Sequence, residues 1–225
     1  MRDLHTRTTI AGVRGFAILA VLIFLPAWTL RYWQGWAFLA TFAAASTALT
    51  VYMALYDREL LERRLRAGPT AETESSQKII VLLVMLGFTA FLVLPVLDHR
   101  FGWSPVPAYV SIVGNVLIAL GFLFIFFVLR ENSYAASTIQ IAEGQRVIST
   151  GPYAVVRHPM YSAALLLVIG MPLALDSWYG LVGMLVILPV LIWRLTDEEN
   201  FLTRNLPGYV EYKSKVRWRL IPGLF

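Results

Sequence analysis

Two polar clusters in the C-terminal half of the sequence contain the side chains best suited to chemistry. Arg157 and His158 directly precede Pro159, and the adjacent carboxylates Glu198 and Glu199 follow after a long apolar stretch. This stretch fits a helical hairpin, so both clusters are expected at the same end of it. Pro159 suits the first turn of a helix, where free N–H groups and the helix dipole favour an anion. Arg157 is therefore a candidate to hold a carboxylate or a phosphate.

The glutamates and two nearby tyrosines favour a cationic ligand. A carboxylate here suits ribose hydroxyls, an ammonium group or a sulfonium, and the ring faces of Tyr153 and Tyr161 suit a sulfonium as well. Adjacent helical residues point about 100° apart, so we expect one glutamate to face the pocket and the other to face water. Glu198 or Glu199 could also accept a proton from an amine or a thiol.

Each of these residues also has a purely structural interpretation. His158 could be an interfacial histidine that caps a helix, and Arg157 could reach towards lipid headgroups. The glutamates could form a surface ion pair with Arg194, which precedes Glu198 by one helical turn. The residue types taken singly are compatible with either interpretation.

The sequence lacks the patterns of several other chemistries. It contains no cysteine and 3 histidines, which excludes thiolate chemistry and argues against a zinc or haem site. We therefore predict no metal. The zinc-protease, Walker, nucleophile-elbow and dinucleotide-binding patterns are missing. No basic stripe interleaved with stacking aromatic residues is visible, so we predict no nucleic-acid partner.

The composition indicates a membrane protein. Of the 225 residues, 58% are hydrophobic and 15% are charged, and the mean hydropathy is +0.65. A water-soluble domain of this size cannot bury so much apolar surface. The apolar runs also lack the alternation of a membrane β-barrel. The predicted fold class is an all-α integral membrane protein.

Apolar stretches of suitable length predict about six transmembrane helices. They cover residues 15–30, 33–55, 79–97, 106–129, 159–175 and 177–193. The first is expected to be a short, retained helix rather than a signal peptide, because no convincing cleavage site follows it. The last two are expected to form a tight hairpin that turns at 176–180 and contains Pro172 and Pro189.

The basic residues predict the orientation. Of 19 Lys and Arg residues, 17 fall on one side of a six-span arrangement, and only Arg31 and Arg100 fall on the other. The positive-inside rule then places both termini and the three long polar segments in the cytoplasm. We expect a multi-pass protein of a bacterial inner membrane. The first polar segment should contain a short surface helix at 57–66 followed by a flexible loop.

Two sequence motifs resemble those of a known enzyme family. Residues 151–161, GPYAVVRHPMY, are similar to the GPY-x3-RHPxY signature of the isoprenylcysteine carboxyl methyltransferases, a broad group that includes the phospholipid methyltransferases. A second signature follows, with Glu198, Glu199, the LPGY run at 206–209, Arg217 and Arg219. The resemblance covers about residues 115–225. It divides the chain into three N-terminal spans on the substrate side (1–105) and a methyltransferase core (106–225).

The resemblance implies an S-adenosylmethionine-dependent methyltransferase with its active site at the cytoplasmic membrane face. Arg157 and Glu199 would be the catalytic residues, and segment 209–217 would fold over the pocket as a lid. The acceptor would be a membrane lipid or another lipophilic molecule that offers an isoprenylcysteine-type carboxylate, a phospholipid amine or a thiol. The cofactor would be bound by residues of both motifs, namely Tyr153, His158, Pro159, Tyr161, Glu198 and Glu199.

Two other functions stay open at this point. A small transporter or channel would use ionisable residues within its spans, but the charges here gather in the polar segments instead. A scaffold protein could retain the methyltransferase fold without catalysis. Cofactor binding distinguishes a methyltransferase from both.

Overall fold

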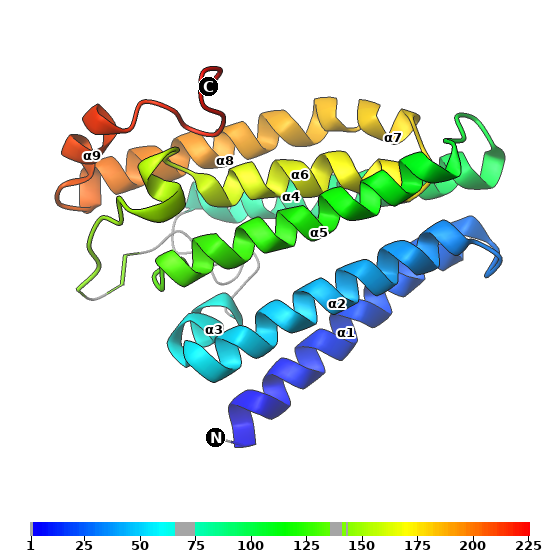
Figure 1. Cartoon of the computed structure of the whole chain (residues 1–225), viewed down its shortest axis with the longest axis horizontal. Helices are drawn as coiled ribbons and strands as arrows, with labels where there is room; N and C mark the ends of the chain where they lie inside the picture. The colour runs from blue at the N-terminus through cyan, green and yellow to red at the C-terminus, as the bar shows by residue number, and fades with distance from the viewer. Residues whose placement is uncertain (1, 66–74, 136–140, 143) are drawn as a thin grey trace.

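The computed structural model describes residues 2–65, 75–135, 141–142 and 144–225, and it confirms the all-α fold class. Helices α4, α5, α6 and α8 lie together, and the α1–α2 pair runs along one side of them (Figure 1). In chain order the described elements are α1 (Arg2–Ala27), α2 (Trp33–Tyr56), α3 (Arg58–Leu65), α4 (Ser75–Phe101), α5 (Ala108–Glu131), the 3-10 helix η2 (Gly151–Ala154), α6 (Pro159–Ala174), α7 (Tyr179–Val182), α8 (Met184–Asn205) and α9 (Tyr209–Lys215).

Five helical segments of the described chain are long and apolar enough to cross a membrane. They are Asp3–Ala27, Trp33–Tyr56, Val81–Phe101, Ala108–Glu131 and Tyr179–Asn205, the last of which joins α7 and α8. The other predicted span is α6, which has 16 residues and is therefore about 24 Å long, against about 30 Å for the apolar core of a bilayer. The structure supports a multi-pass membrane protein but does not confirm the count of six.

The first helix differs from its prediction. The sequence predicted a short helix over 15–30, whereas α1 begins at Arg2 and has 26 residues. Asp3 and Arg7 lie one turn apart, with 3.7 Å between Asp3 Oδ2 and Arg7 Nη1, so the charged N-terminal segment continues the helix instead of ending it. The helix ends before Trp28, whose φ of 57° is left-handed. The prediction of a short first helix is wrong.

The C-terminal hairpin forms as predicted, but its second arm is longer. Pro172 lies inside α6 and Pro189 inside α8. Helix α8 continues to Asn205, well beyond the expected end at 193, so Glu198 and Glu199 are helical residues. The surface helix predicted at 57–66 is α3, while the loop predicted after it lies outside the described residues.

The two ends of the bundle differ in character. The N-terminus, α3 and α9 lie at one end, which we call the basic end, and the α1–α2, α4–α5 and α6–α7 connections lie at the opposite end (Figure 1). Arg31 and Arg100 belong to the opposite end. Exposed tryptophans gather there as well, as is typical of a membrane–water interface; they are Trp28, Trp33, Trp36, Trp103 and Trp178.

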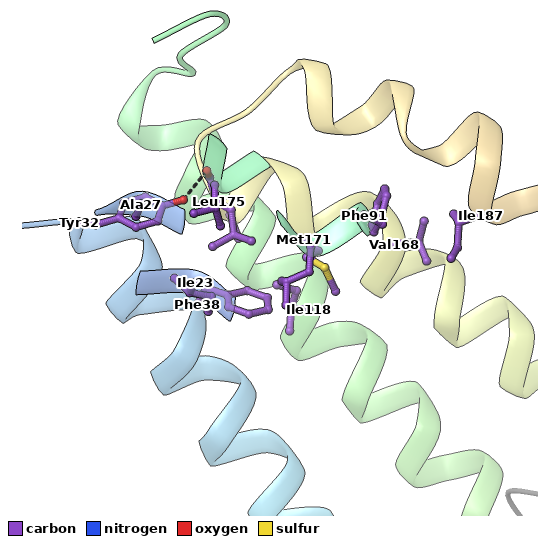
Figure 2. Packing of buried hydrophobic residues seen from close by; sticks show 13 residues of the cluster. Ile23, Ala27, Tyr32, Phe38, Phe91, Ile118, Val168, Met171, Leu175 and Ile187 are labelled. Atoms are coloured by element: carbon purple, nitrogen blue, oxygen red, sulfur yellow. Dashed lines mark hydrogen bonds between the residues drawn. The ribbon is translucent and has the colours of Figure 1, made fainter. Parts of the chain in front are cut away.

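The main apolar core lies towards the opposite end and is built by six helices. Ile23, Phe38, Leu92 and Met171 are among its buried members. Tyr32 belongs to the same cluster, and its hydroxyl donates a hydrogen bond to the carbonyl of Leu175 at 2.6 Å (Figure 2). This bond ties the turn between α1 and α2 to the end of α6.

A buried carboxylate closes the opposite end next to this core. Asp98 at the end of α4 is 1% exposed and accepts a hydrogen bond from the backbone N–H of Ser104 at 2.6 Å. The hydroxyls of Ser104 and Ser177 donate to the same carboxylate. Ser104 precedes α5 and Ser177 follows α6, so Asp98 joins the end of α4 to the connections next to α5 and α6.

A second carboxylate extends this network. Asp176, which adopts a left-handed φ of 66°, accepts a hydrogen bond from the backbone N–H of Val106 at 2.9 Å. Its other oxygen lies 2.7 Å from His99 Nδ1, and the His99 ring stacks on Tyr32 at 3.9 Å between centroids. The opposite end of α6 is therefore fixed by polar contacts as well as by the core.

Helices α5 and α6 pack closely together, because small residues face each other across their contact. A Cβ atom added to Gly114 would lie 2.3 Å from the backbone nitrogen of Ala174 and 2.7 Å from the carbonyl oxygen of Gly170. Small residues that allow such close approach are a common device for packing helices in membranes.

We expect Gly114→Ala to destabilise the protein, because both clashing atoms belong to the backbone of α6 and have no rotamer to change. Overpacking of this kind costs roughly 1–3 kcal/mol. Gly15→Ala is the matched control, since nothing lies within 4 Å of a Cβ at Gly15. The unfolding temperature in detergent should fall for Gly114→Ala and stay unchanged or rise for Gly15→Ala. Equal unfolding temperatures would contradict the close packing of α5 and α6.

Candidate active site

Three parts of the chain meet at the basic end. They are residues 151–161, which we call the corner, the last turns of α8, and residues 206–225, which we call the tail. The backbone N–H of Arg157 donates to the carbonyl of Trp218, and that of His158 donates to the carbonyl of Arg219, both at 2.9 Å. Pro159 is the first residue of α6, as predicted. The corner and the tail are therefore joined directly through their backbones.

Glu199 lies where the three parts meet. It is 2% exposed, and its Oε1 lies 2.6 Å from Arg157 Nε. This contact is an ion pair but does not have the geometry of a hydrogen bond. Its Oε2 accepts a hydrogen bond from Arg219 Nε at 3.0 Å, and His158 Nε2 lies 3.8 Å from Oε1. One buried carboxylate thus compensates the guanidinium groups of the corner and of the tail.

Arg157 and Ser162 add further bonds from the corner and α6 to the tail. Arg157 Nη1 donates to the carbonyls of Val216 and Arg217, both at 2.9 Å. The hydroxyl of Ser162, in the first turn of α6, donates to the carbonyl of Leu220 at 2.6 Å. The Arg157 side chain is therefore held by the tail and is not extended towards lipid headgroups.

Glu198 has a different environment from its neighbour. It is half-buried, and its Oε2 accepts a hydrogen bond from the hydroxyl of Tyr161 at 2.7 Å. Glu198 lines the cavity described below, whereas Glu199 does not. The expectation that one glutamate faces a pocket fits Glu198, but the expectation that the other faces water is wrong, because Glu199 is enclosed by Arg157, His158 and Arg219.

A cavity of about 400 Å³ lies between these elements. Its size is within the range of about 300–1,000 Å³ that is usual for small-molecule sites. Apolar side chains such as Leu191 and Leu206 form part of its wall. The charged and polar side chains that line it are Arg64, Asn132, Tyr134, Gln145, Arg146, Tyr153, Arg157, His158, Tyr161, Arg194, Glu198, Tyr209 and Tyr212.

Tyr153 is fixed on both sides by hydrogen bonds. Its hydroxyl accepts one from Asn132 Nδ2 at 2.9 Å, and its carbonyl accepts one from the hydroxyl of Tyr212 at 2.7 Å. Desolvation raises the pKa of Tyr153 to about 12, so its phenol is neutral at physiological pH. Burial also raises the pKa of Tyr212. These tyrosines offer neutral phenol rings and hydroxyls to a ligand.

Helix α9 covers one side of the cavity, which agrees with the predicted lid. Tyr209, Tyr212 and Val216 are buried against partly buried apolar residues that include Val147 and Leu202. Among the described residues, neither Tyr209 Oη nor His158 Nε2 has a hydrogen-bond partner, although both side chains are buried and both line the cavity. Buried polar groups usually have partners, and His158 Nε2 lies 3.8 Å from Glu199 Oε1, whereas the Tyr209 hydroxyl has no hydrogen bond within the described chain.

The structure brings together nearly all of the predicted site residues. The cavity is lined by Arg157 and by five of the six predicted cofactor residues, which are Tyr153, His158, Pro159, Tyr161 and Glu198. Glu199 lies behind Arg157 instead of on the wall. Within the described chain, no group of three His, Asp or Glu side chains is placed to hold a metal ion.

Sequence reasoning missed several residues of the cavity. Arg64 comes from α3, far from either motif, and no spacing in the sequence connects it to the corner. Asn132 lies at the C-terminal end of α5, before the first motif, and its bond to Tyr153 was not predicted. Arg219, which does not line the cavity, was part of the second motif, but its contact with Glu199 was not predicted because that glutamate was expected to face either the pocket or water.

A cavity at one end of an apolar helical bundle, bordered by a helix N-terminus and by the tail, is a candidate binding or catalytic site. Residues 109–207 match the protein family described as phospholipid methyltransferase. This match includes the first motif together with Glu198 and Glu199, and it supports the resemblance there; Arg217 and Arg219 of the second motif lie outside it. Together with the apolar helices, the match suggests a membrane methyltransferase. No curated protein matches the chain significantly. Helices α1 to α4 and α9 lie outside the matched residues.

We expect Glu199→Gln to release the tail from the corner. The change keeps the side-chain shape but removes the charge shared by Arg157 and Arg219, and leaving a buried charge uncompensated typically costs about 3–5 kcal/mol. Trypsin should then cleave faster after Lys213 and Lys215, as measured by mass spectrometry of the released C-terminal peptides.

The control for this experiment is Glu211→Gln, which removes an exposed carboxylate from the same tail. Its cleavage rate should match that of the wild type. If Glu199→Gln is cleaved no faster than the control, Glu199 does not hold the tail.

Proposed function

We propose that the protein is an S-adenosylmethionine-dependent methyltransferase that acts on a lipophilic acceptor at the basic end. The observation that carries the proposal is the cavity between corner, α8 and tail. Five of the six predicted cofactor residues line it, and all six lie within the family-matched segment. The acceptor would be a membrane lipid or another lipophilic molecule that presents a carboxylate, an amine or a thiol.

The side chains present suit this cofactor. Glu198 and the rings of Tyr153 and Tyr161 offer a carboxylate and aromatic faces to cationic groups. Tyr209, whose hydroxyl has no hydrogen-bond partner among the described residues, and His158 offer further polar groups at the cavity wall. When bound, S-adenosylmethionine supplies an electrophilic methyl group on a sulfonium.

The protein's own contribution to the reaction is binding, alignment and exclusion of water. Arg157 is held rigidly by Glu199 and by two tail carbonyls, so it presents a fixed cation at the cavity wall. Tyr161 fixes the orientation of the Glu198 carboxylate, which accepts the proton when the acceptor is an amine or a thiol. Glu199 acts by positioning Arg157.

We also propose that the basic end faces the cytoplasm, because the positive-inside rule relates basic segments to that side. In this orientation the soluble cofactor enters from the cytoplasm and the lipophilic acceptor enters from the bilayer. The chain has no cysteine, so a single cysteine in place of the exposed Ser214 reports the orientation. It should resist a membrane-impermeant maleimide in intact cells; rapid labelling there would reverse the assignment.

The function is tested by titrating detergent-purified protein with S-adenosylmethionine in a calorimeter. We expect saturable binding to the wild type and about tenfold or weaker binding to Glu198→Gln, which loses one charged contact. The matched control Glu211→Gln changes an exposed carboxylate and should bind like the wild type. A folded wild-type protein that does not bind S-adenosylmethionine would refute the proposal.

Catalysis is tested separately with labelled S-adenosylmethionine and a host-membrane extract. The wild type should transfer the labelled methyl group to an extractable product, whose identification gives the acceptor. Arg157→Ala should lose transfer while its unfolding temperature shows whether the fold is kept. Cofactor binding without transfer to any component would favour a scaffold over an enzyme.

A further inference from the structure

A second hollow lies beside the corner, and we call it the apolar groove. It has a volume of about 560 Å³ and is bordered by the last turns of α5, by the corner and by the end of the tail. Its apolar wall is formed by Phe124, Phe127, Val155, Val156, Leu220 and Pro222. The groove and the cavity of the candidate active site share no described lining residue, so they are separate sites.

Two of the three polar or charged side chains in the groove are already bonded within the protein. The hydroxyl of Ser162 donates to the carbonyl of Leu220 at 2.6 Å, and the carboxylate of Glu131 accepts a hydrogen bond from the hydroxyl of Thr150. Water in the groove would therefore find few partners on an otherwise apolar wall. Such a wall favours an apolar occupant.

The groove continues an apolar stripe along the outside of α5. Val116, Leu120, Leu123 and Phe127 are each between 45% and 50% exposed, and their spacing of three or four residues keeps them on one face of the helix. Phe127 also lines the groove. Because α5 is one of the helices long and apolar enough to cross a membrane, we expect this face to contact the acyl chains of lipids.

Arg130 places a positive charge where the stripe ends. It follows Phe127 by three residues, is exposed, and lines the groove. Unlike the two bonded side chains, it has no hydrogen-bond or ion-pair partner among the described residues. A guanidinium binds phosphate through paired, charge-assisted hydrogen bonds. An apolar stripe that ends at such a cation matches the acyl chain and the phosphate of a lipid.

We propose that the apolar groove binds an anionic phospholipid of the surrounding membrane, with an acyl chain along the stripe of α5 and the phosphate on Arg130. This lipid is distinct from the methyl acceptor, since the groove is separate from the cavity. By contacting Leu220 and Pro222 it supports the tail, whose other residues cover the cavity. The inference goes beyond the proposed function and requires neither cofactor binding nor methyl transfer.

The test measures quenching of a fluorescent label by brominated lipids. The chain has no cysteine, so Leu123→Cys provides a single site for a bimane label, about 10 Å along α5 from Arg130 and next to the middle of the acyl chain. The control site is Ile192→Cys, at an exposed position of α8 that does not line the groove. The full chain is placed in vesicles with rising fractions of phosphatidylglycerol or phosphatidylcholine, each brominated in mid-chain.

At Leu123→Cys, we expect half-maximal quenching at an about fivefold lower fraction of the phosphatidylglycerol than of the phosphatidylcholine, because Arg130 favours the anionic headgroup. At Ile192→Cys the two lipids should quench about equally. Adding Arg130→Gln should abolish the preference at Leu123→Cys, and Arg130→Lys should keep part of it. The matched control Arg14→Gln removes an exposed arginine from α1 and should leave the preference unchanged.

Four results would overturn the inference, given unfolding temperatures that show folded variants. They are equal quenching by both lipids at Leu123→Cys, an equal preference at Ile192→Cys, a preference that survives Arg130→Gln, and an equal loss in Arg14→Gln. Absence of quenching by either lipid would also overturn it, since a second copy of the chain would then cover the stripe. Because the measurement contains no S-adenosylmethionine, its result is independent of whether the proposed function holds.

Discussion

The basic end of the molecule depends on the buried carboxylate of Glu199. It compensates Arg157 of the corner and Arg219 of the tail, and it belongs to α8 itself, so three segments far apart in sequence meet at one charge. Burying this charge is costly unless its partners are correctly placed. Because both guanidinium groups must stay close to the buried carboxylate, the tail is held across the cavity and Arg157 is oriented on the cavity wall.

The opposite end of the bundle also helps to position the corner, because α6 connects the two. Helix α6 begins at Pro159 and is short, so any movement of its far end would displace the corner. Asp98 and Asp176 prevent such movement by binding the connections around α4, α5 and α7. Close contact at Gly114 then holds α6 against α5. The bundle is thus a rigid support for a site built mainly from one end of a hairpin.

Much of this arrangement could be predicted from the sequence, for physical reasons. Apolar length identifies membrane helices, and the motif around Pro159 predicts a helix start beside Arg157 because proline favours the first turn. The length of α1 could not be predicted from hydropathy, since its first turns are polar. Long-range arrangements could not be predicted either. No spacing rule places Arg64 and Tyr153 on the wall of one cavity, and none shows that Glu199 turns away from water towards two guanidinium groups.

The central claim is that the cofactor binds between the corner and the tail. Hydrogen–deuterium exchange of the purified protein, with and without S-adenosylmethionine, tests it most directly. The amides of Arg157 and His158 bond to tail carbonyls, so the account predicts that the cofactor slows exchange at the corner and at α9 together. Slowed exchange confined to the opposite end, or no change in a protein that binds the cofactor, would contradict it.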